Sequence, residues 1–167
     1  MSDINQNEGT VITVPEFKNC KELKLNVSNW HLAKTRMREV QNLVPANYSS
    51  LEFTFQEAWR ESRRNAIMIG DAIKKAQQNI EEIKADIILT EIPRLLDELP
   101  KSANNTDFRK AIISKNPEYK QANEHLEKLE ALLAHTESNM KVMENTSRFM
   151  KKQMDYIIRN GTASPRL

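Results

Sequence analysis

Basic side chains and aromatic rings occur together in two stretches of the chain, and this combination suits contact with a single nucleic-acid strand. Lys and Arg neutralise phosphates, while the rings of Trp59, Phe149 and Tyr156 can stack on bases. The residues expected to contact phosphates are Arg60, Arg63, Arg64, Lys74, Lys75, Arg148, Lys151, Lys152 and Arg159. A solvated charged helix face above buried aromatic residues is the plainer interpretation of the same pattern.

Patterns typical of catalytic or metal sites are absent from the sequence. The only histidines are His31, His125 and His135, and ten residues between the last two do not place them on one helical face for metal binding. No nucleophile elbow, Walker-type loop, zinc motif or dinucleotide fingerprint occurs. We therefore expect no enzyme activity, no catalytic residues, no metal and no other cofactor.

Composition favours one helical domain. The chain has 167 residues, of which 39% are hydrophobic and 29% charged, and it contains only 3 Gly and 6 Pro. A turn-rich sandwich or barrel would need more of these turn-forming residues. The formal charge of +2 is small, so any electrostatic function depends on local segregation of charge.

The sequence indicates a cytoplasmic protein without a membrane partner. Cys20 is the only cysteine, so no internal disulfide can form. The first twenty residues lack the charged start and apolar run of a signal peptide. No apolar stretch approaches the roughly 20 residues that span a bilayer.

Two long series of residues recur at alternating three- and four-residue steps, as in the heptads of a coiled coil. The first consists of Trp59, Ser62, Ala66, Ile69, Ile73, Ala76, Ile80, Ile83 and Ile87. The second consists of Tyr119, Ala122, Leu126, Leu129, Leu133, Thr136, Met140, Met143, Ser147, Met150, Met154 and Ile157. A helix from Pro117 to Arg159 would be about 64 Å long, so it needs a partner of similar length.

Helix breakers predict where these helices start and stop. The chain is expected to reverse within Pro100–Thr106, to form a short helix at Phe108–Ile113, and to start the second long helix at Asn116 and Pro117. Pro93 lies inside the first helical pattern, where it must kink or end the helix, and we favour a kink.

The N-terminal part is less regular. Three- and four-residue steps predict a helix from Ser28 to about Leu43, before Pro45. Apolar residues alternate with polar or small ones, as in strands, in three short segments: Thr10–Val14, Leu23–Val27 and Leu51–Phe55. At the last of these the following helix could instead extend backward.

Together these features predict an all-α fold, an elongated antiparallel helical hairpin with an accessory N-terminal helix and short β segments near the N-terminus. The expected divisions are an arm at 1–27, partly disordered or in short strands, a helical hairpin domain with its N-terminal helix at 28–160, and a flexible tail at 161–167.

An antiparallel hairpin would also segregate charge. Residues 60–75 would lie beside residues 141–159, and each of these segments carries a net charge of +3. Residues 76–98 carry −4 and residues 118–140 carry −3. The open end would therefore be basic and the shaft acidic.

A further stripe lies beside the second series at seven-residue spacing: His135, Val142, Phe149 and Tyr156. A two-helix hairpin would leave this stripe exposed, so we expect it to contact the N-terminal helix or another subunit. The sequence thus favours a homo-oligomer.

The C-terminal part of the chain resembles the C-terminal helix of the UvsY-type recombination mediators of tailed phages. The resemblance lies in the segment Phe-Arg-Lys-Ala-Ile-Ile from Phe108, the segment Asn-Pro-Glu-Tyr-Lys from Asn116, and the Met-rich heptads that follow. The resemblance implies an oligomer that binds single-stranded DNA and helps load a RecA-type recombinase onto DNA covered by a single-strand-binding protein. The resemblance also implies that the protein acts in the cytoplasm of the host cell. The run at Arg94–Asp97 resembles a basic segment of that family, which makes Arg94 a further candidate for DNA contact.

The leading hypothesis is therefore a non-enzymatic recombination mediator that binds single-stranded DNA as an oligomer. One alternative is a helical protein-interaction module, an adaptor or inhibitor, whose exposed face captures a partner helix. Another is a phage structural assembly protein that does not bind nucleic acid.

Overall fold

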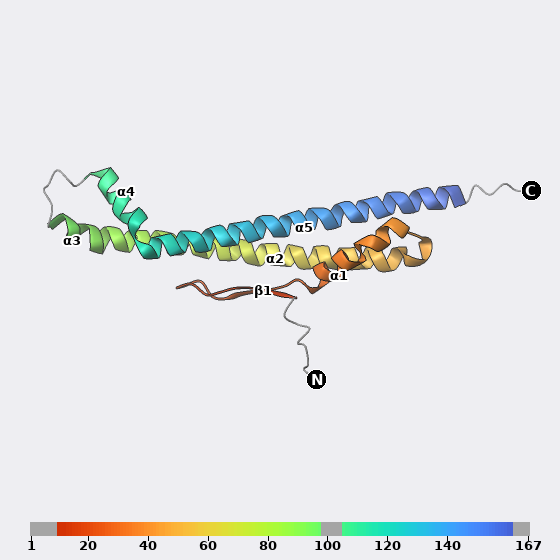
Figure 1. Ribbon diagram of the computed structural model, residues 1–167, viewed down its shortest axis with the longest axis horizontal. Helices are drawn as coiled ribbons and strands as arrows, with labels where there is room; N and C mark the ends of the chain where they lie inside the picture. Colours follow the sequence, from red (N-terminus) through yellow and green to blue (C-terminus); the bar gives the residue numbers. More distant parts are fainter. Residues whose placement is uncertain (1–9, 98–104, 162–167) are drawn as a thin grey trace, which may run out of the picture. The chain divides into compact units, whose positions relative to one another are not determined.

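The computed structural model describes residues 10–97 and 105–161, and most of them are helical (Figure 1). Its elements are β1 (Val11–Val14), β2 (Leu23–Asn26), α1 (Ser28–Arg36), the 3-10 helix η1 (Met37–Asn42), α2 (Pro45–Asp86), the π-helix η2 (Ile87–Glu91), α3 (Ile92–Asp97), α4 (Thr106–Lys115) and α5 (Pro117–Gly161). The all-α fold with a short N-terminal sheet is confirmed. The predicted reversal within Pro100–Thr106 lies mostly outside the described residues, as do the N-terminal nine residues and nearly all of the predicted tail.

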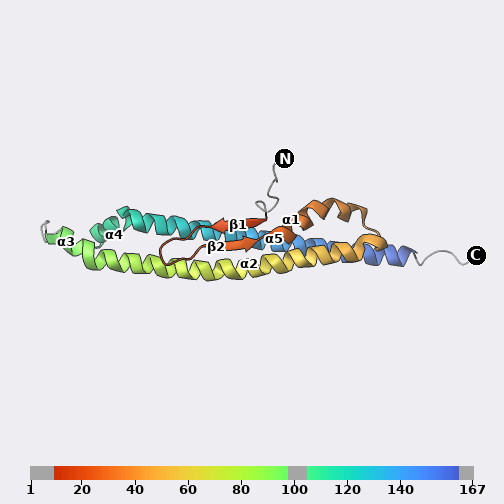
Figure 2. The ribbon, with the colours of Figure 1, turned by 90° about the horizontal axis from the view of Figure 1, so that it is seen from below.

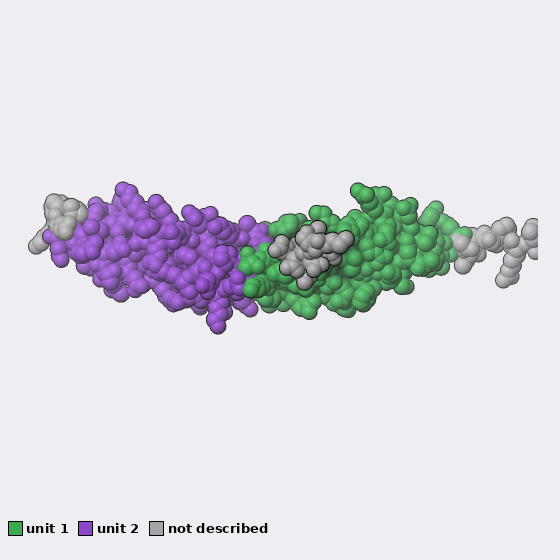
Figure 3. Space-filling view, turned by 60° about the horizontal axis from the view of Figure 1, so that its bottom comes forward, with its two compact units in different colours: residues 1–13, 24–68, 133–167 green, residues 14–23, 69–132 purple. Residues whose placement is uncertain are grey.

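The chain divides into two compact units, coloured green and purple in Figure 3. Unit 1 consists of residues 1–13, 24–68 and 133–167, and unit 2 of residues 14–23 and 69–132. Helices α2 and α5 each contribute one segment to both units. The domain boundaries predicted after residues 27 and 160 stay a prediction.

Within unit 1, α2 and α5 run antiparallel. Glu52, near the start of α2, forms an ion pair with Lys151, near the end of α5. Further along α2, Ser62 borders the same small hollow as Thr136, which comes earlier in α5. The antiparallel pairing of the two long helices is therefore confirmed in this unit, but the predicted register is wrong. Most of residues 141–159 lie beside the part of α2 that precedes Arg60, not beside residues 60–75, because Lys151 meets Glu52 and Thr136 already meets Ser62.

The core of unit 1 forms where the two long helices meet the N-terminal helix. It consists of Ala33, Val40, Leu43, Leu51, Phe55, Ala58, Met143 and Met150, with Trp30, Met37, Tyr48 and Trp59 at its edge. No residue of either predicted heptad series is exposed. The heptad periodicity therefore identified the buried faces of α2 and α5, because contact along a pair of helices repeats every seven residues.

Helix α1 is anchored to α2 by polar groups. The carboxylate of Glu61, only 3% exposed, accepts hydrogen bonds from the backbone N–H groups of Asn29 (3.2 Å) and Trp30 (3.0 Å) and from the hydroxyl of Ser28 (3.3 Å). Asn65 donates its side-chain amide to the carbonyl of Asn26 at 2.7 Å. The N-cap residue of α1, Val27, makes no side-chain cap, and the side chain of Asn26 accepts only from the N–H of Ser28, so α2 supplies the acceptor for the next two N–H groups.

Unit 2 has a second core built mainly from isoleucine. Ile80, Ile83, Ile87, Ile92, Ile113 and Ala122 are its buried members. The segment between the strands also packs here, since Phe17 stacks on His125 with ring centroids 5.5 Å apart and Asn19 donates to Glu82 at 3.1 Å. Lys18 forms an ion pair with Glu118. These contacts attach the loop of the β1–β2 hairpin, seen in Figure 2, to the helices of this unit.

Two sequence expectations for the N-terminal half are refined or corrected. The predicted helix from Ser28 to about Leu43 consists of two parts, because α1 ends at Arg36 and a 3-10 helix follows to Asn42. The strand interpretation of Leu51–Phe55 is wrong, and its alternative, a backward extension of the following helix, is confirmed, since this segment belongs to α2. Leu51 and Phe55 are fully buried, whereas Phe53 is 65% exposed, and this follows from a four-residue spacing on one helical face.

The helical run continues past Pro93, and a π-helical turn precedes this residue. Helix α2 ends at Asp86, η2 follows, and Pro93 lies in the first turn of α3. The N–H of Ile92 donates to the carbonyl of Ile87, five residues earlier. Proline has no N–H to donate, so a change in hydrogen-bond pattern before it lets the chain remain helical.

Candidate nucleic-acid interface

The candidate interface in unit 1 is built around Trp59. Helix α2 places Gln56, Arg60 and Arg63 within one turn of this residue, so their side chains can surround its indole ring. Trp59 is half-buried and packs at the edge of the core. The guanidinium carbon of Arg63 lies 5.3 Å from the centre of the ring, a cation–π contact that helps fix both side chains.

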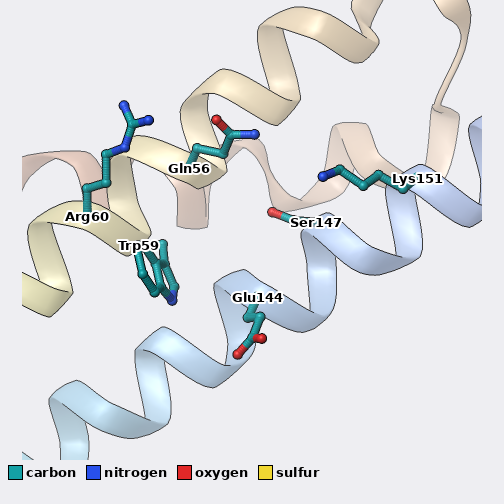
Figure 4. Close-up of a pocket in the computed structure, with 6 residues that line it drawn as sticks. All are labelled: Gln56, Trp59, Arg60, Glu144, Ser147 and Lys151. Carbon is teal, nitrogen blue, oxygen red and sulfur yellow. The ribbon is translucent and has the colours of Figure 1, made fainter.

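A hollow of about 280 Å³ separates α2 from α5 beside this ring (Figure 4). It is lined by Gln56, Trp59, Arg60, Glu144, Ser147 and Lys151, and all six belong to unit 1. In Figure 4 the indole of Trp59 extends toward α5, while the guanidinium of Arg60 points away from that helix. We refer to this space as the Trp59 hollow.

A surface depression also borders Trp59. It has a volume of about 550 Å³ and is lined by Glu57, Trp59, Arg60, Arg63, Arg64 and Ile67. Three arginines and one carboxylate therefore border it. We refer to it as the arginine depression, and Trp59 and Arg60 line both spaces.

Several of the predicted phosphate-binding residues form ion pairs. Arg60 lies 2.6 Å from Glu57, Arg148 lies 2.5 Å from Glu144, and Lys151 lies 3.4 Å from Glu52. These cations are more than half exposed, and such pairs contribute only about 0–1 kcal/mol to stability. An incoming phosphate can therefore replace the carboxylate at little cost.

The structure places the candidate residues in both units. Seven of them lie in unit 1: Arg60, Arg63, Arg64, Arg148, Lys151, Lys152 and Arg159. Lys74 and Lys75 belong to unit 2, as does Arg94, and Lys74 lies 3.9 Å from Asp71. Of these seven residues, Arg60, Arg63 and Arg64 border the arginine depression, and Arg60 and Lys151 line the Trp59 hollow.

Charge differs between the two units. Among the described residues, unit 1 carries twelve Lys and Arg against seven Asp and Glu, a formal charge of +5. Unit 2 carries eleven against thirteen, a formal charge of −2. Unit 1 is thus the part of the described chain that favours polyanions.

The aromatic stripe on α5 is largely uncovered. Val142, Phe149 and Tyr156 are 44%, 48% and 66% exposed. His135 makes an edge-to-face contact with Trp30 of α1, with ring centroids 6.2 Å apart. Contact with the N-terminal helix is therefore present at His135, and contact of the stripe with another subunit stays a prediction.

The phenol of Tyr48, beside the interface, has a raised pKa. Burial is the main cause, and the negative charges of Glu52 and Asp155 raise this pKa further. The phenol therefore stays protonated and neutral near the Glu52 and Lys151 ion pair.

The described residues contain no group of three or more His, Cys, Asp or Glu arranged to hold a metal ion. In the same part of the chain, every helix is too short or too polar to cross a membrane.

Sequence reasoning missed three residues that line the Trp59 hollow: Gln56, Glu144 and Ser147. Ser147 is a small polar residue within the second heptad series, and this could have indicated a space between the helices. Glu61 was counted with the charges of the basic end, but it is buried beneath α1.

Comparison of the chain with protein-family models, with curated proteins and with solved structures gives no match.

Proposed function

We propose that this protein is a non-enzymatic recombination mediator that binds single-stranded DNA as a homo-oligomer in the cytoplasm. The observation that supports this best is the grouping of Arg60, Arg63 and Arg64 beside the accessible ring of Trp59. Cations along a strand and rings for its bases are the two requirements of sequence-tolerant single-strand binding.

The proposed oligomer accounts for tight binding by a site with few cations. One subunit offers few phosphate contacts, and several of its cations already have carboxylate partners. Linked sites bind a long strand far more tightly than one site does, because each later contact is intramolecular. The exposed residues Val142, Phe149 and Tyr156 provide an apolar surface for such self-association.

The resemblance of the C-terminal helix to UvsY-type mediators supplies the expected protein partners. A RecA-type recombinase and a single-strand-binding protein stay predictions that depend on that resemblance. The DNA-binding part of the proposal depends instead on the residues around Trp59 and can be tested without those partners.

The direct test is fluorescence anisotropy of a labelled single-stranded oligonucleotide, titrated with the full-length protein at low and moderate salt. We expect binding that weakens steeply with salt. Each phosphate contact contributes about 0.7 to the slope of log affinity against log salt concentration for single strands. The double variant Arg60→Ala with Arg64→Ala should therefore lower the slope by about 1.4 per strand-binding subunit.

The matched control removes two cations from unit 2. Lys120 and Lys128 are exposed on α5, outside the candidate interface. The variant Lys120→Ala with Lys128→Ala has the same net charge as the test variant. Equal effects of the two variants would show that only total charge matters, and no binding of wild-type protein at low salt would refute the proposal.

A protein-interaction module is the second candidate, and the uncovered stripe on α5 is the observation that favours it. An adaptor or inhibitor would use Val142, Phe149 and Tyr156 to hold a partner helix. In that case one protein should copurify from nuclease-treated extract with the wild type but not with Phe149→Glu. A structural assembly protein, the third possibility from the sequence, would form large regular particles detectable by light scattering.

A further inference from the structure

We infer that the Trp59 hollow receives one unpaired nucleobase, which stacks on Trp59 while the phosphates of the strand lie on the arginine depression. This inference rests on the proposed function and specifies which part of the strand each space contacts. It distinguishes a base-reading protein from one that holds DNA only by its charge.

The size of the hollow fits a single planar group. Its volume of about 280 Å³ lies just below the about 300–1,000 Å³ of pockets that hold drug-sized molecules. A partner helix would need a long groove, whereas this space extends only from Gln56 to Arg60 on α2 and from Glu144 to Lys151 on α5. Trp59 supplies the flat apolar wall on which a base can stack.

Two polar side chains at the hollow are available to a ligand. Within the described chain, the amide of Gln56 and the hydroxyl of Ser147 make no side-chain hydrogen bond or ion pair. Each of these groups can both donate and accept, as the edge of a nucleobase requires. Figure 4 shows them on opposite helices, with Gln56 on α2 and Ser147 on α5.

Charge favours a phosphate less in the hollow than in the arginine depression. The hollow is lined by Arg60 and Lys151 against the carboxylate of Glu144. A neutral base is not repelled by that carboxylate, whereas a phosphate is. The arginine depression, with Arg60, Arg63 and Arg64 against the single carboxylate of Glu57, is the better phosphate site.

The test compares two labelled strands of equal length, an oligothymidylate and an oligonucleotide of abasic sites. Both carry the same phosphates, but only the first has bases. Ser147→Phe fills the hollow, and it should weaken oligothymidylate binding about fivefold or more, as expected for loss of one stacked base. Binding of the abasic strand should remain unchanged.

A second variant and a control make the result decisive. Gln56→Leu removes the amide at nearly constant size, so it should lower oligothymidylate affinity without changing abasic binding. Ser138→Phe adds the same ring on an exposed part of α5 away from the hollow and should change neither affinity. Circular dichroism establishes folding, and if Ser147→Phe does not fold, Gln56→Leu decides.

The possible failures are distinguishable. If wild-type protein binds neither strand at low salt, the proposed function is wrong, and this inference with it. If both strands bind and folded hollow variants retain full affinity for oligothymidylate, DNA binding stands but the base site is refuted. Equal loss of affinity for both strands also refutes the base site, because phosphates alone are then affected.

Discussion

The carboxylate of Glu61 lies at the N-terminus of α1, where it accepts a hydrogen bond from the backbone N–H of Trp30 at 3.0 Å. The two residues are 31 positions apart, so a capping interaction usually made within one helix is made here between α1 and α2. Trp30 in turn packs against the core of unit 1 and contacts His135 of α5. This hydrogen bond therefore helps to hold α1 against the core of unit 1.

Loss of this acceptor should destabilise unit 1. Glu61→Ala leaves the N–H groups of Asn29 and Trp30 without their partner, and a buried unsatisfied donor costs about 1–3 kcal/mol. Glu61→Gln retains an acceptor oxygen and should lose less. Urea denaturation measures both, with the exposed Glu137→Ala as control. Equal stability of Glu61→Ala and this control would contradict the assigned role.

The two phenylalanines of Leu51–Phe55 should differ sharply in their effect on stability. Phe55 is fully buried in the core, and Phe55→Ala should lower the free energy of unfolding by about 3–5 kcal/mol. Phe53, two residues earlier, is 65% exposed, so Phe53→Ala should change it by less than about 0.5 kcal/mol. Chemical denaturation of the two variants tests the helical register directly, and a similar loss in both would refute it.

The exposed stripe on α5 should control self-association. Phe149→Glu introduces a charge where an apolar surface would be buried between subunits, so the molar mass from light scattering should fall toward that of one chain. Phe53→Glu places the same change on an exposed site of α2 and should leave the mass unaltered. Retention of wild-type mass by folded Phe149→Glu would exclude this residue from the interface.

Stability should depend on pH through His125. Burial lowers the pKa of its imidazole below 6.5, and the charge of Lys128 lowers it further. The folded chain therefore binds this proton less readily than the unfolded chain, so the stabilisation is complete above about pH 6.5 and falls as the pH drops toward the lower folded pKa. Denaturation above and below this window should show a smaller loss on acidification in His125→Gln than in wild type. An equal loss in both would assign the pH dependence to other groups.

Cys20 should react slowly in the folded protein. Its side chain is buried, and burial raises the pKa of the thiol, with Lys75 lowering it and Glu82 raising it to smaller extents. Because the thiolate is the reactive form, a disulfide reagent should modify native protein at least about tenfold more slowly than protein unfolded in urea. Equal rates in the two states would show that the loop between β1 and β2 opens readily.

The long helices and their buried faces could be read from sequence because heptad spacing is a local property of the chain. The residues of both series, from Trp59 to Ile87 and from Tyr119 to Ile157, are all at least half-buried. The short strands and the helix after Asn105 were also predictable, since alternation and a capping side chain signal them within a few residues. Leu51–Phe55 shows the limit of such local patterns, because Leu51 and Phe55 can share one face either of a strand or of a helix.

The candidate site could be predicted only in part. Its cations and the ring of Trp59 stand out by type and spacing, and the pairs of Arg60 with Glu57 and of Arg148 with Glu144 follow from three- and four-residue spacing on one helix. The pair of Lys151 with Glu52, by contrast, joins two helices. The Trp59 hollow is lined by residues that are distant in the chain, such as Gln56 and Ser147, which are 91 positions apart. No local pattern contains that information.

The sequence by itself determined the helical class, the two apolar faces and the positions of the basic residues, because these follow from residue type and short-range spacing. Only the tertiary structure decided which residues of α2 and α5 meet, that Glu61 is buried beneath α1, and that Lys74 and Lys75 belong to a different unit from Arg60. Such outcomes depend on contacts between residues distant in the chain, whose free energies arise only when the helices pack.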